Sequence, residues 1–274
     1  MMHAEFLHAT GASRQQLVLL HGWGCNREVW RPLLPQLREW ADITLLDIPG
    51  CAPAAQLGRA LTLDETIDDI LRQCPPQAVY TGWSLGGELA TLVAARYPER
   101  VSGLVTLCSN PCFVQRESDG WPGMPKDVFA FFRRDVAKDP AAALRRFDGL
   151  QAKGAGSPRA LMAQLRAARG VEGSSELLAG LDWLHDLDLR EDLSQLAMPQ
   201  RHLLAAQDAL VPPNVMGTLQ ALCGEERVQA LEGLSHLAPL EAPRRVADAL
   251  FDFALAHDLL APPPAASAQA RDKE

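Results

Sequence analysis

The sequence lacks a long apolar run and lacks an excess of positive charge. No apolar segment approaches the roughly 20 residues that a membrane-spanning helix requires, and the first residues have neither the basic start nor the apolar core of a secretory signal. The formal net charge of −8 disfavours nucleic-acid binding, which depends on clustered lysine and arginine. We therefore expect a cytoplasmic protein with no membrane or nucleic-acid partner, and we take it to be a monomer.

Motifs for metals and cofactors are also missing. The six cysteines are scattered and form no CxxC pair, so we interpret them as small buried side chains rather than as zinc ligands or a disulfide framework. The sequence contains no HExxH motif, no Walker loop and no GxGxxG motif that opens a βα unit. We expect an activity that needs no metal and no cofactor.

Short apolar segments rich in valine, isoleucine and leucine alternate with helical patterns. This alternation is typical of an α/β fold, in which helices cover both faces of a mostly parallel sheet. We predict buried strands at residues 17–20, 43–46, 78–81, 104–107, 202–205 and 228–231. We predict helices at residues 63–74, 85–97, 214–222 and 244–256.

The alternation stops between residue 110 and about residue 190, where helical segments follow one another without strands. Cap residues at Asp139-Pro140, Ser157-Pro158 and Gly173-Ser174-Ser175 mark three helix starts. We predict a helical lid at residues 111–189, inserted into a core formed by residues 1–110 and 190–258. Residues 259–274 are rich in proline, alanine and charge, and we expect a disordered tail there.

The segment Gly82-Trp83-Ser84-Leu85-Gly86 lies between a predicted strand and a predicted helix. This is the context of a G-x-S-x-G nucleophile elbow, in which glycines relieve the crowding around a serine on a tight turn. The alternative is a glycine-rich turn whose serine only caps the helix. We favour Ser84 as a nucleophile.

A serine hydroxyl needs an adjacent base, and the base needs a partner that fixes its tautomer. Asp208 and His236 each follow a predicted strand, at the carboxyl ends where open α/β sheets carry their sites. The chain order Ser, Asp, His is also the order found in α/β-hydrolases. We predict His236 as the general base and Asp208 as the acid that orients it. His21 is a rival, but we expect it to hydrogen-bond within its own loop.

Backbone N–H groups must stabilise the oxyanion of the tetrahedral intermediate. One predicted donor is Leu85, the residue after the nucleophile, and the other is Trp23, in the His21-Gly22-Trp23-Gly24 loop after the first predicted strand. The predicted substrate-binding residues are Trp23, Trp83, Leu85 and, in the lid, Phe147. Ordinary core packing is the alternative role for the two tryptophans.

The predicted lid differs in charge from the rest of the chain. Residues 126–170 carry ten basic and four acidic side chains, a net charge of +6 that leaves −14 for the remainder. Clustered positive charge can pair with the carboxylates or phosphates of an anionic partner, although a solvated helix surface is the alternative. Arg159, Arg166 and Arg169 fall at helical spacing, which predicts one exposed stripe.

Several segments together resemble the pimeloyl-[acyl-carrier protein] methyl ester esterases of biotin biosynthesis, a family of the α/β-hydrolase fold. The motifs around His21 and Ser84 are shared by many hydrolases. Three other segments are more discriminating: Ser109-Asn110-Pro111-Cys112-Phe113, Trp121-Pro122-Gly123 and Arg146-Phe147-Asp148-Gly149-Leu150-Gln151. The resemblance runs from about residue 17 to residue 256.

The resemblance implies an α/β-hydrolase fold with an inserted helical lid. It implies a serine carboxylesterase that converts the methyl ester of pimeloyl-acyl-carrier protein to pimeloyl-acyl-carrier protein and methanol. In the family, lid arginines contact the acidic carrier protein, and Arg146 and Arg159 match such positions. Two further expected arginines fall near Ala142 and Ala163, and the loop at residues 47–53 departs from the common hydrolase pattern. The alternatives are a broad-specificity short-chain carboxylesterase, an acyl thioesterase, and a catalytically silent binding module.

Overall fold

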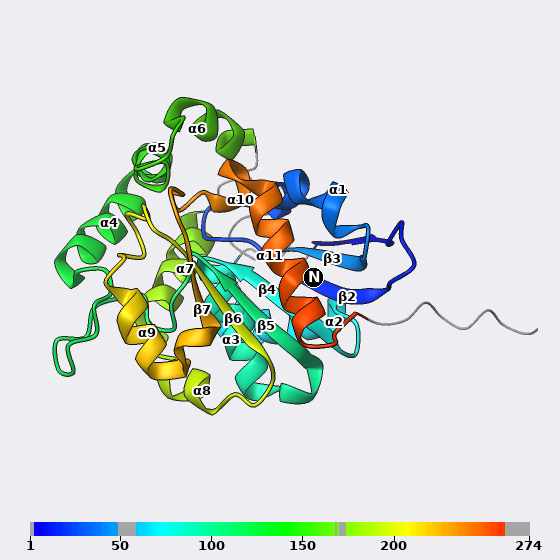
Figure 1. The fold of residues 1–274 in the computed structure, drawn as a ribbon. Helices are drawn as coiled ribbons and strands as arrows, with labels where there is room; N and C mark the ends of the chain where they lie inside the picture. The colour runs from blue at the N-terminus through cyan, green and yellow to red at the C-terminus, as the bar shows by residue number, and fades with distance from the viewer. Residues whose placement is uncertain (1–2, 49–58, 168, 170–173, 261–274) are drawn as a thin grey trace, which may run out of the picture.

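The structure is a computed structural model that describes residues 3–48, 59–167, 169 and 174–260 (Figure 1). Seven strands in these ranges form one sheet with the order β1-β3-β2-β4-β5-β6-β7. β1 pairs antiparallel with β3, and the other neighbours are parallel. The strands are β1 (His3–Leu7), β2 (Gln15–Leu20), β3 (Ala41–Asp47), β4 (Ala78–Trp83), β5 (Val101–Leu107), β6 (Gln200–Ala205) and β7 (Val228–Leu231).

All six predicted strands are present, and their ends extend up to three residues beyond the predicted bounds. The antiparallel edge strand β1 is not predicted from the sequence. None of its residues is buried, and it therefore lacks the continuous apolar pattern of the inner strands. The mostly parallel sheet agrees with the predicted α/β-hydrolase architecture.

Alternating side chains of the inner strands build a core on each face of the sheet. Val18 and Leu20 join one buried cluster, whereas Leu17 and Leu19 join the other. The first face is covered by α2 (Leu63–Gln73), α3 (Leu85–Arg96), α8 (Arg190–Gln195) and α9 (Val215–Cys223). The second is covered by η1 (Arg27–Leu33), α1 (Leu34–Leu37), α10 (Ala238–Glu241) and α11 (Pro243–Ala256), while η2 (Pro98–Arg100) and η3 (Glu225–Arg227) are short connecting turns.

The segment between β5 and β6 contributes four helices that do not belong to these layers. They are α4 (Lys126–Lys138), α5 (Pro140–Gln151), α6 (Pro158–Ala167) and α7 (Ser174–Asp186), and Figure 1 shows α4, α5 and α6 gathered at one end of the molecule. The last three begin where the cap residues predict, and the Asp139 carboxylate accepts the N–H of Ala142 at 2.9 Å. The Leu189 N–H donates to the Pro111 carbonyl at 2.8 Å, so the two ends of this segment meet.

The described chain ends at residue 260, so most of the predicted tail, residues 261–274, lies outside the described residues, as do residues 49–58. Leu259 and Leu260 are half-buried and pack against the core. Within the described ranges, no helix is long and apolar enough to cross a membrane.

Candidate active site

Ser84 lies on a sharp turn between β4 and α3, and its backbone is strained. Its φ of 55° and ψ of −125° are rare for a residue that carries a side chain. The turn is held by two backbone hydrogen bonds, from Ser84 N–H to the Leu107 carbonyl at 2.9 Å and from Gly87 N–H to the Ser84 carbonyl at 2.8 Å. Strain of this kind, held in place by its surroundings, is characteristic of functional sites.

The glycines around Ser84 are required by close backbone approach. A Cβ added at Gly82 would lie 2.1 Å from the Gly86 carbonyl oxygen, and a Cβ at Gly86 would lie 2.3 Å from the Leu20 carbonyl oxygen. A Cβ at Gly22 would lie 3.0 Å from the Cβ of Ser84. The loop after β2 therefore packs directly against the serine, and the sequence pattern has a steric cause.

Asp208 and His236 follow the neighbouring strands β6 and β7, and the structure brings them together. His236 Nδ1 lies 2.8 Å from Asp208 Oδ2, and each side chain is about 1% exposed. The other carboxylate oxygen, Oδ1, accepts the backbone N–H groups of Leu210 at 2.8 Å and Val211 at 3.0 Å. A carboxylate fixed in this way orients the ring so that Nδ1 carries the proton and Nε2 carries the lone pair.

The Nε2 atom of His236 is the nitrogen available for base catalysis. It is buried and has no hydrogen-bond partner among the described residues, so it is not hydrogen-bonded to Ser84. Bonds between a nucleophile and its base are often long before substrate binds. Trp83, which precedes Ser84, donates its indole N–H to the His236 carbonyl at 2.9 Å. The residue before the serine thus anchors the backbone of the histidine.

His21 hydrogen-bonds within its own loop and to the end of β3. Its Nε2 accepts the Ile48 N–H at 2.8 Å, so the ring proton lies on Nδ1, which is 2.9 Å from the Gly22 carbonyl oxygen and donates to it. Burial lowers the pKa of His21 to about 4. A neutral ring with both nitrogens engaged supports the loop and leaves no free base.

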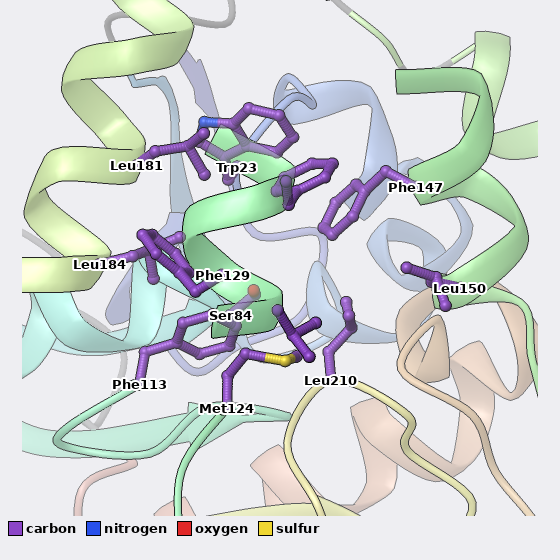
Figure 2. Close-up of a pocket in the computed structure, with 12 residues that line it drawn as sticks. Trp23, Ser84, Phe113, Met124, Phe129, Phe147, Leu150, Leu181, Leu184 and Leu210 are labelled. Carbon is purple, nitrogen blue, oxygen red and sulfur yellow. The ribbon is translucent and has the colours of Figure 1, made fainter. Parts of the chain in front are cut away.

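An apolar cleft opens beside Ser84 (Figure 2). Its lining joins the core to the lid, and Figure 2 shows side chains from both parts pointing into one space. Ser84 is the one polar residue of the described lining, whose other members are Trp23, Phe113, Met124, Val128, Phe129, Phe132, Phe147, Leu150, Leu181, Leu184 and Leu210. Such a space suits an unbranched hydrocarbon chain.

Trp23, in the wall of this cleft, contacts three helices of the lid. Its indole N–H donates to the Leu177 carbonyl of α7 at 2.8 Å. Its ring packs edge-on against Phe132 of α4 and Phe147 of α5, with centroid distances of 5.5 and 5.1 Å. Of the predicted substrate-binding residues, Trp23 and Phe147 therefore line the cleft.

Trp83 and Leu85 are not among the residues that line the cleft. Trp83 has no exposed surface and belongs to the core cluster on the α11 side of the sheet, where its role is the bond to His236. Leu85 is 2% exposed and packs in the cluster on the other face. Sequence reasoning also misses Phe113, Phe129 and Phe132, because a helical or loop aromatic gives no sign of which cavity it enters.

The cleft opens to solvent between α4 and α5. Val128 and Leu150 line the cleft and are also 50% and 43% exposed, so they form its rim. Arg145 and Arg146 on α5 and Arg159 on α6 are exposed. Arg146 donates to Asp135 of α4 at 2.6 Å, an exposed pair across the two rim helices.

The predicted exposed stripe of Arg159, Arg166 and Arg169 is wrong for Arg169. Its side chain is 10% exposed and forms an ion pair with Asp148, which has no exposed surface. Arg166, 58% exposed, lies 3.5 Å from the same carboxylate. Part of the positive charge of the lid is therefore neutralised internally, because Asp148 of α5 pairs with Arg166 of α6 and with Arg169, which follows α6.

One group of metal-type ligands occurs in the described residues. The Sγ of Cys108 and ligand atoms of Asp208 and His236 lie within 4.8 Å of one another. Burial, reinforced by the charge of Asp208, raises the pKa of the Cys108 thiol, which therefore stays protonated and ligates poorly. Since Asp208 and His236 already bond to each other, the group fits an acid–base pair beside a neutral thiol better than a metal site.

Comparison with known proteins places the chain among hydrolases. The family defined by the α/β hydrolase fold matches residues 16–243. The pimeloyl-[acyl-carrier protein] methyl ester esterase of Edwardsiella ictaluri is 38% identical over 256 residues, covering 92% of this chain and 98% of that protein. The Citrobacter koseri protein of the same name is 37% identical over 243 residues, covering 88% and 94%. An esterase from Exiguobacterium antarcticum shares the fold, with a TM-score of 0.78 at 20% identity over 92% and 94% of the two chains.

Proposed function

The chain belongs to the pimeloyl-[acyl-carrier protein] methyl ester esterases of the α/β-hydrolase fold, and from this membership we propose that it hydrolyses the methyl ester of pimeloyl-acyl-carrier protein. The products are methanol and pimeloyl-acyl-carrier protein, a step of biotin biosynthesis. The observation that carries the proposal is the buried Asp208–His236 hydrogen bond close to a strained serine that lines an apolar cleft.

In the proposed reaction, Ser84 Oγ attacks the ester carbonyl carbon while His236 Nε2 takes the hydroxyl proton. The bond to the methoxy group then breaks, and Nε2 returns the proton to the leaving oxygen to give methanol. Water attacks the acyl-enzyme with His236 again as base, and the proton passes to Ser84 as the product acid leaves. Asp208 stays ionised and stabilises the imidazolium.

Two backbone N–H groups are proposed to bind the oxyanion. Leu85 is the first residue of α3, where N–H groups have no partner within the helix. Trp23 lies in the loop that packs against Ser84 through Gly22. Both groups thus belong to rigid segments that meet at the nucleophile, as preorganised stabilisation of the intermediate requires.

The apolar cleft is proposed to hold the acyl chain. Each methylene group that leaves water for such a lining gains about 0.8 kcal/mol. The substrate ester is neutral, whereas the product carboxylate is charged and is disfavoured in an apolar space. The same lining therefore favours binding of the ester and release of the acid.

The rim of the cleft is proposed to receive the acyl-carrier protein. The exposed Val128 and Leu150 border the opening, and Arg146 and Arg159 lie on the neighbouring lid helices. A carrier protein is acidic and delivers its acyl chain on a phosphopantetheine arm, so a basic rim around an apolar opening complements both parts. We also propose the lid at residues 111–189 as the unit that carries this surface, and a cytoplasmic location.

The test is product analysis with the carrier-bound methyl ester. Wild type should release methanol and leave the acyl thioester on the carrier. Ser84→Ala should reduce methanol release to background with an unchanged circular dichroism spectrum, whereas Ser194→Ala, on the surface helix α8, should keep wild-type turnover. Turnover retained in Ser84→Ala would reject the nucleophile. Free carrier thiol as the product would indicate a thioesterase, and failure of a fluorophosphonate to label Ser84 would indicate a silent binding module.

A further inference from the structure

A second, smaller space also reaches Ser84. It shares Ser84, Phe113 and Leu184 with the apolar cleft, so the two spaces meet at the nucleophile. Its remaining walls differ in character, because they include Glu88 of α3 and Asn110 of the loop after β5. A polar wall beside the reacting serine has no part in holding a hydrocarbon chain.

Glu88 lies one helical turn after Ser84, on the same side of α3. Its side chain is 2% exposed, and neither carboxyl oxygen has a hydrogen-bond partner of normal geometry in the described part of the protein. Burial raises the pKa of Glu88 well above 4.5, and the nearby Phe113 amide and Arg116 charge oppose this only in part. This shift favours the neutral form, in which a carboxyl group that lines the pocket offers an O–H donor and an acceptor oxygen.

Asn110 adds a second unpaired donor. The residue is 5% exposed, and its Oδ1 accepts the Cys112 N–H at 3.2 Å. Its Nδ2 is buried and has no partner among the described residues. Buried polar groups are almost always paired, so unpaired groups on two elements that face one small pocket point to a ligand that completes them.

The geometry of an ester indicates which of its groups lies in each of the two spaces. The carbonyl carbon attacked by Ser84 carries an acyl chain and an alkoxy group, which leave it in different directions. The larger cleft, with its apolar lining, suits the acyl chain. The alkoxy group is then left with the smaller space, whose walls offer donors to an oxygen.

We propose that this small pocket is the alcohol subsite of the esterase, that Glu88 limits the alkoxy group to about the size of methoxy, and that Glu88 and Asn110 hydrogen-bond the departing alcohol. The inference rests on the proposed esterase function. The leaving oxygen receives its proton from His236 in the reaction already described, and its lone pairs then accept from the Glu88 O–H and the Asn110 N–H. Glu88 is thus a specificity residue that fits a methyl ester.

The test compares alkoxy groups on one acid. Values of kcat/KM for methyl, ethyl and propyl hexanoate are measured for wild type, Glu88→Ala and Glu88→Gln. Wild type should prefer methyl to propyl by about tenfold or more, the range that a tight pocket achieves against added methylene groups. Glu88→Ala should raise the propyl-to-methyl ratio by about tenfold, and Glu88→Gln, which keeps size and hydrogen bonding, should leave it within about twofold.

The matched control is Phe147→Leu, in the wall of the apolar cleft. It should change the preference among methyl butyrate, hexanoate and octanoate and leave the propyl-to-methyl ratio unchanged. An unchanged ratio in a folded Glu88→Ala protein, or a shift in acyl-length preference instead, would overturn the alcohol subsite. Absence of turnover by wild type on these esters and on the carrier-bound methyl ester would instead overturn the proposed function, so the two failures are distinct.

Discussion

Asp208 holds His236 through a hydrogen bond of 2.8 Å in which both side chains are withdrawn from solvent. Asp208→Asn keeps the shape of the side chain but favours the wrong imidazole tautomer, which leaves no lone pair for the Ser84 proton. We expect kcat for methanol release to fall by about 10³-fold to 10⁴-fold. Asp64→Asn, on the exposed surface of α2, should retain activity. A loss below about tenfold in Asp208→Asn would contradict the orienting role.

The lid arginines should affect hydrolysis of the carrier-bound ester and not hydrolysis of a small free ester. Arg146→Glu and Arg159→Glu should each lower kcat/KM on the carrier-bound ester by about tenfold, because rim charges act mainly on association, and should change kcat/KM on methyl hexanoate by less than about twofold. Arg146→Ala serves as a second variant, since Glu at this position would face Asp135. Arg72→Glu, exposed on α2, is the control. Equal losses on both substrates would remove the docking surface.

The buried pair Asp148–Arg169 should stabilise the lid. Asp148→Asn leaves the Arg169 guanidinium enclosed without its counter-charge, and we expect the free energy of unfolding to fall by about 3 kcal/mol. Asp135→Asn removes the partner of the exposed Arg146 and should cost less than about 1 kcal/mol. Urea unfolding followed by circular dichroism measures both. Similar losses in the two variants would show that burial does not set the strength of the Asp148 pair.

Glu88 should make the protein less stable as the pH rises. Its pKa in the folded state lies above the value of 4.5 expected when unfolded, so its favourable contribution is complete below pH 4.5 and declines as the pH rises from there toward the folded pKa. Glu88→Gln stays neutral, and its free energy of unfolding should gain on that of wild type between pH 4.5 and pH 8. Glu99→Gln, on the surface, should follow wild type. A difference between Glu88→Gln and wild type that does not vary with pH would contradict the buried neutral carboxyl.

Features with a local cause are predictable from this sequence. The inner strands are buried on both faces and so appear as apolar runs, and Asp139-Pro140 caps α5 where its chemistry requires. The elbow around Ser84 is predictable because a Cβ added at Gly82 or Gly86 would lie 2.1 or 2.3 Å from a backbone carbonyl oxygen, so both positions require glycine. The location of the Trp83 side chain is less obvious. Strand residues alternate between the two faces of a sheet, so Trp83 lies on the opposite face from Tyr80, in the core beside α11.

Features that depend on distant contacts are not predictable in this way. β1 forms because β3 offers an edge, and the enclosed pair Asp148–Arg169 joins residues 21 positions apart that charge counting assigns to the surface. Glu88 does leave a signal. It is the single charged residue between Leu85 and Ala95, and a helix that is otherwise apolar all round is a buried helix. A single acidic residue in such a helix therefore indicates a buried carboxyl group.

Trp23 has a mechanical consequence for how ligands reach Ser84. Its indole bonds to α7 and packs against side chains of α4 and α5, and a Cβ added at Gly180 of α7 would lie 2.8 Å from its Cδ1. Three lid helices thus contact one indole ring in the loop before the nucleophile. The lid cannot move away from the core without breaking all of these contacts. While these contacts hold, a ligand that enters past the rim at Val128 and Leu150 is limited in cross-section by the width of that opening.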